Sequence, residues 1–127
     1  MLATRIDKFF KSESLYKGAT YSLYEPSLKV GQFCILNTDT DIPDPPYGTH
    51  WVGLYRGPHM YYYFDSLGNP PVVKHANMFH NDKQLQPNDS NKCGFWAVSF
   101  CLWMSRGNKY NDFMNAWTES DFVNIKL

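Results

Sequence analysis

The feature that most constrains the fold is an almost wholly apolar run over residues 95–104, FWAVSFCLWM. Residues of types favoured at helix N-caps precede it at 89–91, and Gly107 suits the position just after a helix. The pattern therefore predicts a helix over about residues 92–106. Because this helix would be apolar on nearly every face, we expect it to be buried at the centre of the fold.

Cys93 falls in the first turn of this predicted helix. Unpaired backbone N–H groups and the helix dipole favour negative charge there, which lowers the pKa of a thiol and populates the nucleophilic thiolate. Gly94 beside it would let a substrate backbone come close. The alternative is a buried structural cysteine, a role that fits Cys101 in the same helix better.

The composition fits a single domain over residues 1–127 with one core. Lys+Arg and Asp+Glu are both 12, and this balance gives no support to nucleic-acid binding. The three cysteines include no CxxC pair, which argues against a disulfide scaffold and a zinc site, and for a reducing, intracellular compartment. We expect no metal, no cofactor, no membrane span, and a monomer.

Shorter elements are predicted around the central helix. We expect a helix over 3–11, an irregular arm over 12–28, a strand over 30–38, a surface loop over 38–48, a hairpin formed by 50–57 and 60–68, a short helix near 72–79 and a closing helix over 110–125. The predicted fold class is α+β: a small mixed or antiparallel sheet packed around a buried helix that carries Cys93 at its N-terminus.

The predicted hairpin brings two polar residues together. Because residues alternate between the faces of a strand, His50 shares a face with Val52 and Leu54, and Asp65 shares a face with Tyr63. A hairpin places the start of its first strand beside the end of its second. His50 and Asp65 should therefore lie close in space.

Four residues together suggest a site with a cysteine nucleophile. The Cys93 thiolate would attack a carbonyl, and His50 would take up the thiol proton and later donate it to the leaving amine. Asp65 would orient the imidazole and stabilise its charged form. Gln86 would donate to the developing oxyanion beside the backbone N–H of Cys93, and one such donor lowers the barrier by about 3 kcal/mol.

Each of these residues also has a purely structural alternative. His50 could be a hydrogen-bonded histidine of the sheet, and Asp65 could cap the turn after it, with Asp82 as the other candidate acid. Gln86 could be a solvated loop residue, with Gln84 as the rival oxyanion donor.

Three motifs resemble the adenain-like cysteine protease family, which includes the adenovirus maturation protease and, more distantly, the deSUMOylating ubiquitin-like-protein-specific proteases. The motifs are ILNT at 35–38 with GTHW at 48–51 after a loop, YFDSLG at 63–68, and QPNDSNKCG at 86–94. The order His–Asp–Gln–Cys is the reverse of that in papain, whose cysteine comes first. The resemblance covers about residues 30–105.

Two features depart from adenain. The third member is Asp65, as in the deSUMOylating branch, where adenain has Glu. The chain is also shorter, and it has no counterpart of the cysteine that links the activating peptide of adenain, since Cys34 precedes His50.

The resemblance implies a cysteine endopeptidase with chemistry like that of papain in a permuted order. It makes Cys93 the nucleophile, His50 the general base, Asp65 the third member and Gln86 the oxyanion donor. Trp51, which could also be a core residue, would wall a narrow substrate groove and shield the ion pair.

The resemblance also implies a biological setting. Relatives nearest in size and motif are viral or virus-like, so the expected task is cleavage of capsid precursors during virion maturation, after small residues such as Gly, in the virion and the infected host cell. An activating peptide or DNA is implied by the resemblance alone. The alternatives are a deconjugating protease for ubiquitin-like modifiers and, from another class, an inactive protease-like interaction module.

Overall fold

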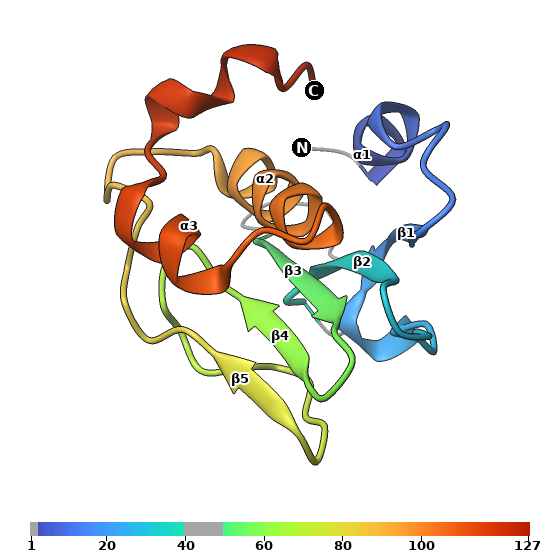
Figure 1. Ribbon diagram of the computed structural model, residues 1–127. Coiled ribbons are helices and arrows are strands. Elements are labelled where there is room, and N and C mark those ends of the chain that lie inside the picture. Colours follow the sequence, from blue (N-terminus) through green and yellow to red (C-terminus); the bar gives the residue numbers. More distant parts are fainter. Residues whose placement is uncertain (1–2, 40–49) are drawn as a thin grey trace.

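A computed structural model describes residues 3–39 and 50–127 (Figure 1). Its elements are α1 (Ala3–Phe9), β1 (Tyr16–Tyr21), η1 (Ser22–Tyr24), β2 (Phe33–Asn37), β3 (Trp51–Arg56), β4 (Tyr61–Phe64), β5 (Met78–His80), α2 (Cys93–Ser105), α3 (Tyr110–Ala116) and η2 (Glu119–Asn124). The strands of the described residues form one sheet in the order β1-β2-β3-β4-β5. The inner pairs are antiparallel and the two outer pairs parallel. The predicted α+β class, with a mixed sheet around a central helix, is confirmed.

Helix α2 lies on one face of the sheet and packs against the central strand β3 (Figure 1). The predicted central helix is confirmed, and most of its side chains are buried. Gly53 in β3 permits the close approach, because a Cβ at this position would lie 2.8 Å from the Cys101 sulfur. Gly107, with a φ of 81°, follows the helix in the left-handed conformation that glycine favours.

Alternating side chains of β2 and β3 contribute to two separate cores, one on each face of the sheet. The core on the α2 side includes Phe33, Ile35, Trp51, Phe64, Trp96, Phe100 and Phe113. The core on the other face includes Leu28, Cys34, Leu36, Val52, Leu54, Tyr63 and Val73.

The predicted hairpin is confirmed as β3 and β4, and the strand predicted over 30–38 as β2. Arg56 pairs with Tyr61 near the closed end of the hairpin, and Gly53 pairs with Phe64 toward its open end. The chain thus enters the open end just after His50 and leaves it at Asp65. The helix predicted over 3–11 is also confirmed, as α1.

The prediction of an irregular arm over 12–28 is wrong, because this segment contains β1 and η1. Strand β1 pairs in parallel with β2 at the edge of the sheet. Its residues are nearly all half-buried, so the strand carries no clear alternation of apolar and polar residues.

The short helix predicted near 72–79 is also wrong. This segment is irregular, with bends at residues 72–73 and 76–77, and leads into β5, which runs parallel to β4 from the pairing of Tyr61 with Met78. A parallel partner requires the chain to return to the start of β4, and this irregular connection makes that return. Along the way, Val73 enters the second core and the His75 ring stacks on Tyr61 at 3.8 Å.

The predicted closing helix over 110–125 is divided into α3 and η2 by an extended break at Trp117 and Thr118. Thr118 and Asp121 form a capping box that starts η2 as a separate element. At α2, the N-cap is Lys92, without a side-chain cap, rather than a residue of 89–91. Most of the surface loop predicted over 38–48 lies outside the described residues.

Candidate active site

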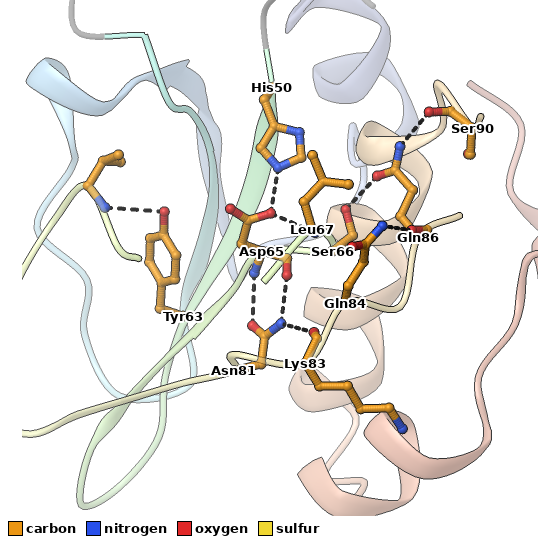
Figure 2. A network of polar contacts seen from close by, with 11 residues as sticks. His50, Tyr63, Asp65, Ser66, Leu67, Asn81, Lys83, Gln84, Gln86 and Ser90 are labelled. Atoms are coloured by element: carbon orange, nitrogen blue, oxygen red, sulfur yellow. Dashed lines mark hydrogen bonds and ion pairs between the residues drawn. The ribbon is translucent and has the colours of Figure 1, made fainter. Parts of the chain in front are cut away.

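His50 and Asp65 meet at the open end of the β3–β4 hairpin, as the pairing of the strands predicts. His50 Nε2 lies 2.6 Å from Asp65 Oδ1 (Figure 2). The backbone carbonyl of His50 accepts a hydrogen bond from the Thr38 N–H at 2.8 Å, which ties the residue to the end of β2. Because Nε2 is engaged with Asp65, Nδ1 is the ring nitrogen that remains for a second partner.

Asp65 is buried, with 1% of its surface exposed, and is held from two sides. Its Oδ1 also accepts a hydrogen bond from the Leu67 N–H at 2.8 Å. Its backbone N–H donates to Asn81 Oδ1 at 3.0 Å, while Asn81 Nδ2 donates to the Asp65 carbonyl at 2.6 Å. The Asn81 side chain therefore continues the ladder between β4 and β5 by one step, and it fixes the backbone that carries the carboxylate.

Cys93 is the first residue of α2 and is partly exposed, and its thiol contacts His50. Burial by itself raises the pKa of the Cys93 thiol, but hydrogen bonds with His50 and with the backbone of Trp51 and Gly94 outweigh it and lower the pKa below its ordinary value. Burial lowers the pKa of His50, but hydrogen bonds with Asp65 and Cys93 outweigh this and raise it to about 9. The two shifts favour a thiolate–imidazolium pair.

The other two thiols are in a different environment. Cys34 and Cys101 are fully buried, and burial raises the pKa of each thiol above its ordinary value. Neither has an imidazole as a stabilising partner. Of the three thiols, Cys93 is therefore the one whose pKa is lowered.

The Gln86 side chain is buried between two partners, with 4% of its surface exposed. Its Nε2 donates to the Ser90 carbonyl at 2.8 Å, and its Oε1 accepts from the Ser66 hydroxyl at 2.7 Å. Figure 2 shows the amide between these two residues. The amide nitrogen has two hydrogens, and the Ser90 carbonyl takes one of them.

The rival residues lie elsewhere. Asp82 is exposed, and its backbone packs against Gly68. Gln84 is also exposed, and its amide donates within its own loop, to the Gln86 carbonyl at 2.8 Å and to Asn88 Oδ1 at 2.7 Å. Asp65 is therefore the acid that contacts His50, whereas the Gln84 side chain forms hydrogen bonds within the loop that precedes α2.

The two residues predicted to bind substrate are both buried. Trp51 is 4% exposed and packs in the core on the α2 side, while its backbone contacts the Cys93 thiol. Gly94 contributes its backbone to the same thiol. Their roles toward a substrate remain predictions.

Sequence reasoning gave no role in the site to four residues that support it: Ser66, Asn81, Ser90 and Glu119. Ser90 stands next to Glu119, whose Oε2 accepts from the Ser90 hydroxyl at 2.6 Å and from Trp96 Nε1 at 2.9 Å. Partnered polar residues of this kind have no periodic pattern in a sequence. The spacing of Thr118 and Asp121, typical of a capping box, could have placed Glu119 at the start of a helical turn.

Within residues 3–39 and 50–127, no cluster of three or more His, Cys, Asp or Glu residues could hold a metal ion. The same residues contain no helix with the length and apolar character needed to cross a bilayer.

Comparisons with known proteins give a likeness in structure and none in sequence. No family model matches the chain, and no curated protein matches it in sequence. Among solved structures, the chain is similar to the ASFV pS273R protease, with a TM-score of 0.57 and 14% sequence identity over 94% of this chain. The match covers 61% of that protease, so the chain spans about three-fifths of its length. At this identity the likeness concerns the fold alone.

Proposed function

We propose that this protein is a cysteine endopeptidase in which Cys93 is the nucleophile and His50 the general base. Asp65 orients His50, and Gln86 stabilises the oxyanion. The observation that carries the proposal is the chain of contacts from Asp65 through His50 to Cys93. The likeness in fold to the ASFV pS273R protease supports it independently.

The geometry supports a two-step mechanism. The Cys93 sulfur attacks the peptide carbonyl carbon, a C–S bond forms, and the carbonyl electrons move to the oxygen, where Gln86 and the Cys93 N–H donate hydrogen bonds. The intermediate then collapses, the C–N bond breaks, and the His50 proton passes to the leaving amine. In the second step His50 takes a proton from water, and the resulting hydroxide attacks the thioester carbonyl; the C–S bond breaks, the acid is released, and the Cys93 thiolate is left beside the His50 imidazolium.

We propose capsid precursors as substrates, cleaved after small residues such as Gly during maturation in the virion and the infected cell. This part of the proposal rests on the motifs at 48–51, 63–68 and 86–94 and on the viral protease of similar fold. It also predicts a monomer without metal or cofactor, on which an activating peptide or DNA could act.

The first test is the alkylation rate of each cysteine by iodoacetamide as a function of pH, resolved by mass spectrometry, in the wild type and in His50→Ala. Cys93 should react fast at about pH 6.5, where an ordinary thiol is protonated. In the variant its rate at this pH should fall by about tenfold or more, because the thiolate loses its imidazolium partner. Cys34 and Cys101 serve as internal controls and should stay slow in both proteins.

The second test is hydrolysis of fluorogenic peptide amides that carry Gly before the cleaved bond. A Cys93 that is as slow as Cys101 at neutral pH in the wild type contradicts the proposed thiolate–imidazolium pair. A reactive Cys93 with no hydrolysis of peptides, folded capsid precursors or modifier conjugates would instead favour an inactive module.

A further inference from the structure

The Gln86 amide forms a hydrogen bond at each end, with the Ser66 hydroxyl and with the Ser90 carbonyl, and the sequence analysis gave neither group a role. The Ser90 carbonyl can only accept a hydrogen bond, so the end of the amide that faces it must be the nitrogen, Nε2. The oxygen, Oε1, then faces the Ser66 hydroxyl, which must donate. These two contacts, the amide clamp, allow a single orientation of the amide.

Ser66 also holds the backbone of Gln86. Its carbonyl accepts from the N–H groups of Leu85 and Gln86, at 2.9 and 3.0 Å. Ser66 is 1% exposed and follows Asp65 directly in sequence. Two consecutive residues at the end of β4 thus contact the two halves of the proposed machinery, because Asp65 binds His50 and Ser66 binds Gln86.

The Ser90 side of the clamp is also fixed. The Ser90 hydroxyl donates to Glu119 and accepts from the Lys92 N–H at 3.1 Å, immediately before the first residue of α2. The Ser90 carbonyl is therefore anchored relative to both η2 and the start of α2.

We infer that Ser66 is a positioning residue for the oxyanion donor: its hydroxyl orients the Gln86 amide so that an N–H faces the oxygen that develops on the substrate. This inference rests on the proposed function and extends it to a residue outside the Cys–His–Asp–Gln set. Ser66 does not touch the substrate and acts only through Gln86.

A double-mutant cycle tests the inference, with Ser66→Ala, Gln86→Ala and the pair of substitutions. The substrate is a fluorogenic peptide amide that ends in Gly-Gly. Gln86→Ala should lower kcat by about 100-fold, as expected for a lost oxyanion donor. Ser66→Ala should lower kcat by about tenfold with little change in KM, because the amide is retained but loses its fixed orientation. In the Gln86→Ala background, Ser66→Ala should have no further effect.

The rate of Cys93 alkylation distinguishes a lost orientation of Gln86 from a general loss of structure, because only a general loss of structure would change this rate. Iodoacetamide reacts with a thiolate by displacement and develops no oxyanion, so the rate and pH profile for Cys93 should be unchanged in Ser66→Ala. Ser66→Thr, which keeps the hydroxyl, should retain kcat within a few-fold. Ser99→Ala is the matched control, because it removes a buried hydroxyl that has no partner among the described residues.

Failure of the inference and failure of the proposed function would give different results. The inference is overturned if Ser66→Ala keeps the wild-type kcat, if its effect multiplies with that of Gln86→Ala, or if Ser66→Thr is as impaired as Ser66→Ala. It is also overturned if alkylation of Cys93 slows together with hydrolysis. A wild type that cleaves no peptide, or a Gln86→Ala variant of full activity, would instead contradict the proposed function on which the inference rests.

Discussion

Cys93 and Cys101 occupy one helix, about two turns apart, yet the helix places them in opposite chemical environments. Cys101 packs over Gly53, in the middle of β3, where burial raises the pKa of its thiol. Cys93 faces the end of the same strand, where His50 lies just before β3 and lowers the pKa of its thiol. A position in a buried helix therefore does not by itself lower the pKa of a thiol. The contact with His50, just before β3, does so for Cys93.

The difference follows from what a strand can offer at each place. Along the middle of β3 the backbone groups are paired and the side chains fill the cores. Just before β3 and just after β4 the side chains of His50 and Asp65 meet beyond the last pair of the two strands, Gly53 and Phe64. The middle of the sheet therefore contributes packing, whereas the polar contact between His50 and Asp65 lies beyond the ends of β3 and β4.

The largest effect should come from truncating the two thiols separately. Cys93→Ala should lower peptide hydrolysis by about 10⁴-fold or more while leaving the fold intact, because the nucleophile is lost. Cys101→Ala should keep the activity of the folded protein and reduce the free energy of unfolding by about 1–2 kcal/mol, because it leaves a small cavity. Steady-state kinetics and denaturant unfolding measure the two effects. Similar losses of activity in both variants would contradict the proposal that Cys93, and not Cys101, is the nucleophile.

Asp65→Asn should have the next largest effect. The amide is almost the same size as the carboxylate but no longer favours the charged imidazole, so kcat should fall by about 10³-fold. Alkylation of Cys93 near neutral pH should slow, while that of Cys101 stays as slow as before. Asp82→Asn, at an exposed position, is the matched control and should leave both rates unchanged. A kcat within tenfold of the wild type would contradict the role of Asp65.

The pH profiles should separate two readouts at Cys93. The pKa of His50 is raised to about 9, so the imidazolium is retained through neutral pH and lost as the pH rises through that value. Hydrolysis, which needs that proton for the leaving amine, should fall about tenfold per pH unit above it. Alkylation, which needs only the thiolate, should not fall. A hydrolysis limb near pH 6.5 would mean that His50 titrates as an ordinary histidine.

The smallest effect on activity should come from Gly53→Ala, which tests the packing around Cys101. The added methyl group would lie 2.8 Å from the Cys101 sulfur and 3.2 Å from the Ala97 carbonyl oxygen. We expect the free energy of unfolding to fall by about 1–3 kcal/mol. Adding Cys101→Ala should restore part of this loss, because it removes the closer of the two contacts. No rescue in the double variant would place the strain at the Ala97 carbonyl instead.

The sequence predicts best the parts with strong local signals. An apolar run on all faces identifies α2, and two aromatic β-rich runs with a short connection identify β3 and β4. The proximity of His50 and Asp65 follows from that hairpin alone, without knowledge of the core.

The parts that the sequence does not predict depend on distant partners. β1 and β5 are edge strands, each paired on one side only, so their residues lack a clear alternation. The hydrogen bonds of Ser66 and Asn81 join residues 20 and 16 positions apart, and nothing in a local pattern shows that a serine or an asparagine will be buried. Supporting residues of a site are therefore harder to predict than its reactive residues.

The dispersal of these contacts along the chain has a consequence for biosynthesis. A ribosome delivers the hairpin with His50 and Asp65 first, Cys93 later, and the Glu119 that fixes Ser90 last. Until α2 docks on the sheet, the emerging chain carries only an ordinary thiol, separated from its imidazole. The lowered pKa of Cys93 and the raised pKa of His50 therefore require segments far apart in the chain to be packed together.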